Sequence, residues 1–354
     1  MPEDLINTLG VTVPICQSPM AGVSSPAMAA AVSNSGGLGA LGIGASGVEK
    51  AREMIRQTRA LTDRPFNVNV FCHRPAQPDP ARETDWLNLM APVFESFGAS
   101  PPSTLSEIYT SFLVDMRMLQ MLLAERPAVV SFHFGVPGSD VIRALKDVGI
   151  ALMATATSLA EARTIAAAGI DAVVAQGWEA GGHRGVFDAD AEDARLSALD
   201  LTRILVGELN IPVVTAGGLM DGGDIAKALS LGAVAAQLGT AFIDCDESLA
   251  DAGYRAALHS GAAKNTTMTA AISGRPARCL ANEFTAWATE TAEAVPPDYP
   301  IAYDAGKALN AAAKSAGVAG FGAQWAGTGA PRARTGSAVD IMNVLIDEWR
   351  AATA

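Results

Sequence analysis

The sequence has 354 residues, of which 49% are hydrophobic and 18% charged, and its formal net charge is −12. This length is sufficient for a large buried core. The acidic balance argues against a nucleic-acid partner, because phosphate binding requires clustered Lys and Arg. No stretch is long and apolar enough to span a membrane, and the N-terminus lacks the layout of a signal peptide. We therefore expect a cytoplasmic protein without a membrane partner.

The cysteines and histidines form no metal-binding or redox motif. The four cysteines are widely scattered, and so are the four histidines: Cys16, Cys72, Cys245 and Cys279, and His73, His133, His183 and His259. Metal sites and redox motifs require closely spaced ligands or thiols. We expect reduced cysteines and no metal.

Short apolar runs alternate with helical segments along most of the chain. Eight runs are typical of buried parallel strands: residues 14–18, 38–41, 66–71, 128–132, 150–154, 171–174, 212–215 and 235–238. Helices are expected between them, at 25–35, 48–60, from 139, from 158, 199–209 and 221–231, with a last one at 337–350. Ser25 followed by Pro26, and Ser158 followed by Glu161, are helix-start signals. Eight such units predict a (β/α)8 TIM barrel, with a doubly wound sheet as the alternative.

Two segments do not fit the simple alternation. Residues 73–102 are rich in proline and are expected to be irregular, with a mostly helical segment following at 105–125. Residues 241–330 exceed the needs of one barrel helix, and helical patterns occur at 247–260, 281–294 and 303–316. We therefore expect a barrel made of residues 1–240 and 331–354, with 241–330 forming an additional, mainly helical lid subdomain.

The most informative stretch is residues 175–185, which follows the sixth strand. It contains four glycines together with Gln176, Trp178 and His183. Glycines let the backbone approach a ligand closely, and barrel active sites lie at the carboxyl ends of the strands. A binding site is therefore favoured over a plain loop. Met20, Asn69, His133, Gln176, Gly218 and Gly239 are expected at the same end of the barrel.

A phosphate site is predicted at the ends of the last three strands. Glycine pairs or glycine-threonine pairs occur there at Gly181–Gly182, Gly217–Gly218 and Gly239–Thr240. Free amides and a following helix start favour an anion. No GxGxxG fingerprint follows the first strand. With Asn69 and Gln176 available to hydrogen-bond a ring system, the pattern favours FMN over a dinucleotide.

These motifs together resemble the class I nitronate monooxygenases, formerly called 2-nitropropane dioxygenases. The resemblance runs over nearly the whole chain and is most specific around His183. It implies an FMN-dependent barrel that oxidises alkyl nitronates, such as propionate 3-nitronate, with O2 to a carbonyl compound and nitrite. Electron transfer from the nitronate to the flavin is expected, and His183 would be the active-site base. With the predicted phosphate loops, the expected FMN contacts are Met20, Gly22, Asn69, Gln176, Gly181, Gly182, Gly217, Gly218, Gln237, Leu238, Gly239 and Thr240.

The resemblance also implies a substrate pocket that uses all four tyrosines of the chain. Its expected residues are Tyr109, Tyr254, Tyr299, Tyr303 and Lys307, and the end of the fourth strand adds His133 as a candidate. Tyr299, Tyr303 and Lys307 are spaced four apart and would share one helix face. Hydroxyls and an ammonium suit a small anion, although a solvated helix face is the alternative.

The sequence is also compatible with other functions. The nearest is an FMN-dependent NAD(P)H:quinone or enoyl-thioester reductase built on the same barrel, and a more distant one is a non-catalytic barrel that binds phosphorylated ligands. A monomer or a homodimer is expected. His183 is required as a base only if neutral nitroalkanes are substrates, because a nitronate has already lost the proton.

Overall fold

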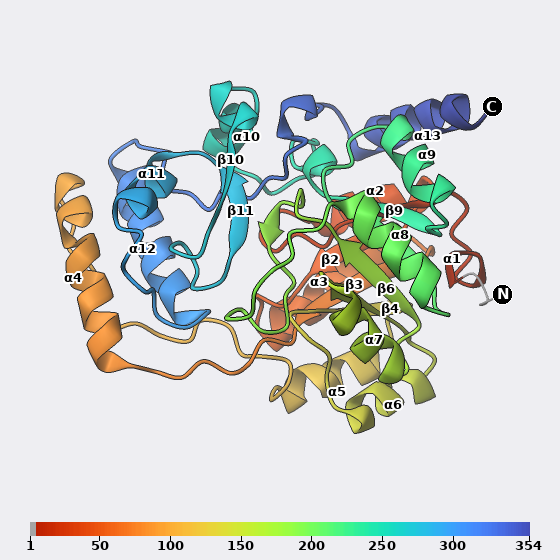
Figure 1. Ribbon diagram of the computed structural model, residues 1–354, viewed down its shortest axis with the longest axis horizontal. Coiled ribbons are helices and arrows are strands. Elements are labelled where there is room, and N and C mark those ends of the chain that lie inside the picture. Colours follow the sequence, from red (N-terminus) through yellow and green to blue (C-terminus); the bar gives the residue numbers. More distant parts are fainter. Residues whose placement is uncertain (1–4) are drawn as a thin grey trace.

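The computed structural model describes residues 5–354, and their central feature is a barrel of eight parallel strands (Figure 1). In pairing order the strands are β1 (Ile15–Gln17), β9 (Ala235–Leu238), β8 (Val213–Ala216), β6 (Ala172–Gln176), β5 (Ala151–Ala156), β4 (Val129–His133), β3 (Phe66–Phe71) and β2 (Gly39–Gly42). The two ends of this order also meet, because Gln17 N donates to Leu38 O and Leu38 N to Ile15 O, both at 2.9 Å. The predicted (β/α)8 barrel is confirmed, and an open doubly wound sheet is excluded.

Helices surround the barrel, and all of them except α1 and α5 begin near the predicted residues. They are α2 (Pro26–Asn34), α3 (Val48–Leu61), α5 (Met116–Glu125), α6 (Ser139–Asp147), α7 (Leu159–Ala167), α8 (Ala198–Glu208), α9 (Gly222–Ser230) and α13 (Ala338–Thr353), preceded by the short α1 (Leu5–Thr8). The Ser25 side chain caps α2 by accepting from Met28 N at 3.0 Å, and Pro26 occupies the first helical position. The helix-start signals therefore operate as expected.

The capping box predicted for α7 is only half formed. Ser158 Oγ accepts from Glu161 N at 3.2 Å. The Glu161 carboxylate, however, accepts from Thr157 N at 2.6 Å and from Phe187 N at 2.7 Å. Glu161 therefore joins the end of β5 to the loop that follows His183.

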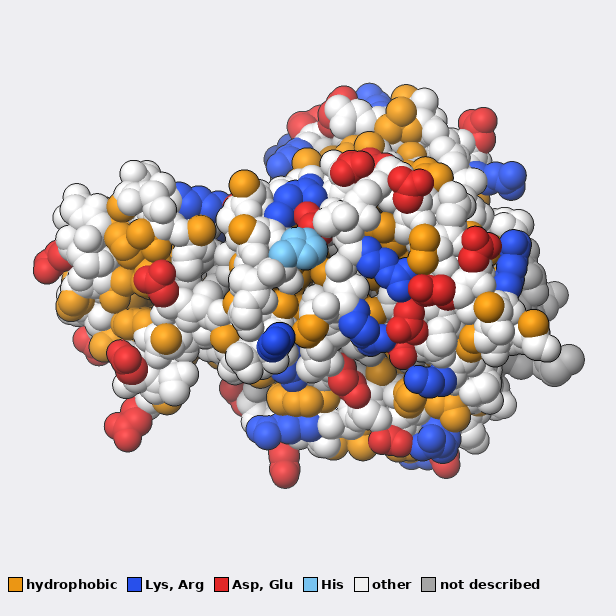
Figure 2. All heavy atoms as spheres, turned by 90° about the horizontal axis from the view of Figure 1, so that it is seen from above, with side chains coloured by type: hydrophobic (Ala, Val, Ile, Leu, Met, Phe, Trp, Pro, Cys, Tyr) orange, Lys and Arg blue, Asp and Glu red, His pale blue; other side chains and the backbone are white. Residues whose placement is uncertain are grey.

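A second lobe lies beside the barrel, where Figure 1 shows α4, α11 and α12 together. It contains α4 (Pro80–Ser96), α10 (Ala252–Leu258), α11 (Glu283–Glu290) and α12 (Ile301–Ser315), and a small antiparallel sheet of β10 (Thr266–Thr269), β11 (Ala277–Leu280) and β7 (Gly182–His183). Three 3₁₀ turns, η1 (Thr240–Phe242), η2 (Gly261–Lys264) and η3 (Ala330–Arg332), also follow β9. In the space-filling view the lobe forms a separate bulge joined to the larger body by a waist (Figure 2).

Two expectations about secondary structure were wrong here. The segment 73–102 contains the 17-residue helix α4, which Asp79 caps and which tolerates Pro92 in its interior. Its Trp86, Met90 and Phe94 recur every four residues and share one apolar cluster with the lobe. Conversely, residues 105–115 are not helical, and only Met116–Glu125 forms a helix.

Candidate active site

A cavity of about 390 Å³ opens at the carboxyl ends of the barrel strands and extends beneath the second lobe. The predicted site residues that line it are Met20, Gly22, Asn69, Tyr109, His133, Gln176, Gly181, Gly182, His183, Gly217, Gly218, Gln237, Gly239, Thr240, Tyr254, Tyr299, Tyr303 and Lys307. Leu238 is the one predicted residue that does not line it. Its side chain is fully buried in the barrel core beside Ile15, because it points away from the cavity on β9.

Free backbone amides gather on one side of this cavity. Within the described residues, the N–H groups of Gly181, Gly217, Gly218, Gly239 and Thr240 have no protein acceptor. Backbone donors are normally paired unless water or a ligand accepts from them. Gly217 and Gly218 have φ of +123° and +72°, a conformation that L side chains rarely adopt. This amide cluster has the character of an anion site.

The helix start after β8 does not serve the anion as expected. The first turn of α9 is occupied by the protein's own carboxylates, because Asp221 accepts from Asp224 N at 2.9 Å and Glu348 from Gly222 N at 3.0 Å. The short turn η1 after β9 has no side-chain cap. A phosphate would therefore meet the start of η1, an arrangement common in barrels with a short extra helix after the last strands.

His183 is held at the cavity by strand pairing and by its own carbonyl. β7 places it opposite Ala277 of β11. The His183 carbonyl accepts from Gln176 Nε2 at 3.0 Å and from His133 Nε2 at 3.1 Å. Gln176 Oε1 in turn accepts from Gly185 N at 2.7 Å. The side-chain amide of Gln176 therefore holds the loop around His183 in place, although it also borders the cavity.

His133 has a defined protonation pattern. A carbonyl can only accept, so Nε2 of His133 carries the hydrogen that it donates to His183. Nδ1 then accepts from Thr155 Oγ1 at 3.1 Å. Both ring nitrogens are thus engaged with protein groups, and His133 borders the cavity as a support for His183.

Arg184 anchors the other end of the glycine-rich loop. Its side chain is 2% exposed and bonds to Asp193 through Nε at 2.6 Å and through Nη2 at 3.1 Å. Nη1 donates to Gln176 O at 2.5 Å. The guanidinium also lies 5.7 Å from the Trp178 ring centroid, so Trp178 has a structural role outside the cavity.

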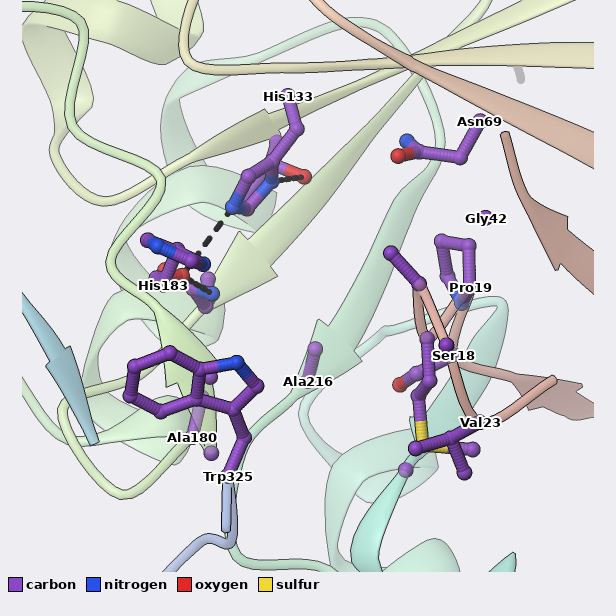
Figure 3. Close-up of a pocket in the computed structure, with 18 of the residues that line it drawn as sticks. Ser18, Pro19, Val23, Gly42, Asn69, His133, Ala180, His183, Ala216 and Trp325 are labelled. Carbon is purple, nitrogen blue, oxygen red and sulfur yellow. Dashed lines mark hydrogen bonds between the residues drawn. The ribbon is translucent and has the colours of Figure 1, made fainter. Parts of the chain in front are cut away.

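An aromatic wall surrounds the imidazole of His183. Ring centroids of Trp325, Tyr299, Phe134 and Tyr303 lie 5.0, 5.2, 5.7 and 6.1 Å away. Figure 3 shows His183, His133 and Trp325 on one wall, with Ser18, Pro19 and Asn69 across the cavity. The cavity lies between these two walls.

The tyrosines of the wall differ in what their hydroxyls do. Tyr254 OH donates to the Trp325 carbonyl, so this residue supports the wall. Tyr299 OH is buried without a hydrogen-bond partner among the described residues, although the residue borders the cavity. Lys307 Nζ lies 4.7 Å from the Tyr109 ring and 5.2 Å from the Tyr303 ring and forms no salt bridge with the described chain. The Lys307 ammonium is therefore free to bind a ligand, whereas the Tyr299 hydroxyl is enclosed by protein atoms.

Electrostatics keeps the histidines of the site neutral. Burial, followed by the charges of His133 and Arg275, lowers the pKa of His183 from 6.5 to about 3. Burial is also the main cause that lowers the pKa of His133 to about 4. Both imidazoles are therefore neutral at physiological pH.

Sequence reasoning did not identify three residues of this region: Trp325, Ser273 and Arg275. Trp325 lines the cavity, Ser273 bonds to His183, and the Arg275 guanidinium lies 4.5 Å from the Phe134 ring. All three come from the second lobe, and no local motif marks them. Only the fold brings them to the barrel.

Comparison with known proteins decides the family. The family model described as nitronate monooxygenase matches residues 3–348. The chain is 60% identical to a nitronate monooxygenase of Paraburkholderia phytofirmans, over 98% of this chain and 94% of that protein. It is 53% identical to one of Pseudomonas aeruginosa, over 99% and 100% of the two chains. The chain belongs to the nitronate monooxygenase family.

Solved structures agree with this membership. The chain superposes on the nitroalkane oxidase of Streptomyces ansochromogenes with a TM-score of 0.89 and 38% identity, over 99% of both chains. FabK of Thermotoga maritima is also similar, with a TM-score of 0.74 and 27% identity over 99% of this chain and 96% of that one. As a nitronate monooxygenase family member, the protein is an oxidoreductase. None of the helices in residues 5–354 meets the length and hydropathy needed to cross a membrane.

Proposed function

We propose that the cavity binds FMN, with the phosphate at the free amides of Gly181, Gly217, Gly218, Gly239 and Thr240. The flat ring would lie between the Asn69 wall and the His183 wall. Several glycines of the cradle leave no room for a side chain: at Gly181, for example, a Cβ would lie 2.4 Å from Gly327 N. Asn69 donates through Nδ2 to Ser131, which leaves its carbonyl oxygen free for a ring N–H. These residues fit the cofactor.

With FMN bound, the protein would oxidise alkyl nitronates with O2 to a carbonyl compound and nitrite. The flavin supplies the electron acceptor for this reaction. The observation that supports the proposal is the wall opposite the flavin position, where Lys307 Nζ forms no salt bridge with the described residues and lies in the same cavity as a neutral His183. A small anion would gain hydrogen bonds and a countercharge there. Propionate 3-nitronate is the substrate that family resemblance suggests.

His183 would have a second task with neutral nitroalkanes. Its imidazole would take the proton from the carbon next to the nitro group, and the electrons of that C–H bond would form the C=N bond of the nitronate. The wall residues would then stabilise the anion just formed. Nitronates supplied as such would bypass this step.

The second lobe would act as the lid over this chemistry. Residues 241–330 and α4 form one packed unit, because α4 shares an apolar cluster with α11 and α12. We propose that this unit excludes water from the cavity. The lobe also supplies Tyr254, Tyr299, Tyr303 and Lys307 to the cavity. Substrate would enter and leave by movements of this lobe.

The experiment measures nitrite from a panel of nitronates and from the corresponding nitroalkanes. His183→Asn should reduce kcat/KM for nitroalkanes by 10²-fold or more, as expected for loss of a general base, and affect nitronates much less. Equal small losses on both substrates would contradict the base role. The reductase alternative is tested by mixing the protein with NADH without oxygen. Rapid flavin bleaching without nitrite formation from nitronates would favour a reductase.

A further inference from the structure

The second lobe places one buried hydroxyl directly on the imidazole of His183. Ser273 Oγ lies 2.8 Å from His183 Nε2. The same oxygen lies 3.3 Å from the carbonyl of Arg275 and can donate to it. Ser273 is 0% exposed and lies in the turn between β10 and β11. Since no substrate can reach this hydroxyl, it cannot be a nucleophile.

The two contacts of Ser273 have a consequence for the hydrogen on His183. A serine hydroxyl has one hydrogen and can accept through its lone pairs. If the hydrogen goes to Arg275 O, the oxygen accepts from His183 Nε2–H and both contacts are hydrogen bonds. If the hydrogen goes to Nε2, the Arg275 carbonyl loses this donor in a buried place, which is costly. The first pattern is therefore favoured.

The other ring nitrogen of His183 is left for chemistry. Within the described residues Nδ1 has no hydrogen bond, and it is not among the buried atoms that lack a partner. It therefore opens on the cavity that the ring lines. With the hydrogen on Nε2, the lone pair of Nδ1 would face a substrate bound in this cavity.

We propose that Ser273 is a positioning residue that fixes His183 in the tautomer with hydrogen on Nε2, so that Nδ1 serves as the base. This assignment rests on the proposed function, because it gives His183 a proton to take. When a nitroalkane transfers its proton to Nδ1, the C–H bond breaks and an N–H bond forms. Ser273 Oγ continues to accept from Nε2–H, and the hydrogen bond strengthens as the ring becomes cationic.

The contact between Ser273 and His183 also offsets the effect of unfavourable charges near the ring. Three positive or potentially positive groups act on His183, namely His73, His133 and Arg275, and all disfavour the imidazolium. Ser273 is the group that accepts a hydrogen bond from the ring. It would therefore ease proton uptake at a site that otherwise resists it.

The direct test is NMR of protein labelled with ¹⁵N in its four histidines. His133 is the internal standard, because its two contacts fix hydrogen on Nε2. In the wild type, His183 should show the same pattern, with an unprotonated Nδ1. Ser273→Ala should yield a mixture of tautomers, and Ser273→Thr should restore the wild-type pattern. Hydrogen on Nδ1 in the wild type, or an unchanged pattern in Ser273→Ala, would overturn the proposal.

Kinetics gives an independent reading. Ser273→Ala should lower kcat/KM for nitroalkanes about tenfold, the factor typical of one lost hydrogen bond, and leave nitronates within about threefold. Ser273→Thr should recover most of the loss. Ser33→Ala removes another buried hydroxyl, which donates to Pro65 O at 2.8 Å, accepts from Gly39 N at 3.1 Å and does not line the cavity, and it controls for stability alone.

The outcomes separate this inference from the function on which it rests. Equal losses on both substrates in Ser273→Ala would overturn the positioning role and leave the function standing. A wild type that releases nitrite from nitronates but not from nitroalkanes would remove the base role and Ser273 with it. A wild type inactive on nitronates would refute the proposed function, and the NMR result would then show only a structural contact.

Discussion

His73 offers a test of how the aromatic wall controls protonation. Both ring nitrogens of this buried imidazole lack a hydrogen-bond partner among the described residues, and the ring is 1% exposed. It packs edge-on against Tyr299 with centroids 4.9 Å apart. Burial, followed by the charge of Arg275, lowers its pKa from 6.5 to about 4. His73→Phe therefore removes a titratable group together with two buried ring nitrogens.

The magnitude follows from proton linkage. The unfolded chain binds a proton at this histidine below pH 6.5, whereas the folded protein does not until about pH 4. Stability is therefore lost as the pH falls through this window. Integrating the difference from pH 7 to pH 5 gives about 2 kcal/mol for one such group. Removing two buried unpaired nitrogens should add about 1 kcal/mol at any pH. His73→Phe should thus stabilise by about 1 kcal/mol at pH 7 and about 3 kcal/mol at pH 5.

The assay is guanidinium unfolding of wild type and variants at both pH values, with the same cofactor loading. His73→Gln is the matched control, because it also lacks the titratable ring but keeps a buried polar group. Relative to wild type, the free energy of unfolding of both variants should rise by about 2 kcal/mol between pH 7 and pH 5. Only His73→Phe should already be more stable than wild type at pH 7. A stability difference that is the same at both pH values would refute the reasoning, since it would mean that His73 titrates alike in the folded and unfolded chain.

Two further changes test the loops that form the site. Arg184→Met should lower the free energy of unfolding by about 1–3 kcal/mol, because it removes a charged donor from the half-buried Asp193 carboxylate and from Gln176 O. The exposed pair of Arg163 is the control, and Arg163→Met should cost under about 1 kcal/mol by the same unfolding assay. Gly181→Ala should weaken FMN binding at least about tenfold in a fluorescence titration, since its Cβ would lie 2.4 Å from the nitrogen of Gly327. Gly207→Ala, where a Cβ meets nothing within 4 Å, should leave FMN affinity unchanged, and the opposite ranking would refute the cradle.

The barrel could be predicted because its information is local. Each strand is a short apolar run that ends at polar or glycine residues. Helices such as α2 begin at capping residues such as Ser25, which can be recognised in the sequence. The cavity followed from these ends, because parallel strands bring them to one mouth. The same locality explains why the side chain of Leu238, unlike those of the other predicted site residues, does not line the cavity. Its backbone is at the mouth, but the alternation of the strand turns its side chain into the core.

The second lobe could not be predicted as well, because its structure depends on partners distant in sequence. The prolines at 80 and 92 suggested irregular backbone, yet Trp86, Met90 and Phe94 bury an apolar helix face against α12. The β10–β11 hairpin pairs with β7 of the barrel loop, and nothing near residue 273 indicates that this turn meets His183. Tertiary contacts therefore supply what the local pattern lacks.

The passage of α4 into the second lobe means that the lobe is not one exchangeable insertion. Asp298, just before α12, accepts from Gln77 N at 3.1 Å and pairs with Arg82 at 2.7 Å. Hydrogen bonds and an ion pair therefore connect the segment before α4 and its first turn to the segment before α12, although the two are far apart in the sequence. A graft of residues 241–330 alone into a related barrel would lack α4, so the apolar faces of α11 and α12 that pack against it would be uncovered. A functional chimera must therefore contain both α4 and residues 241–330.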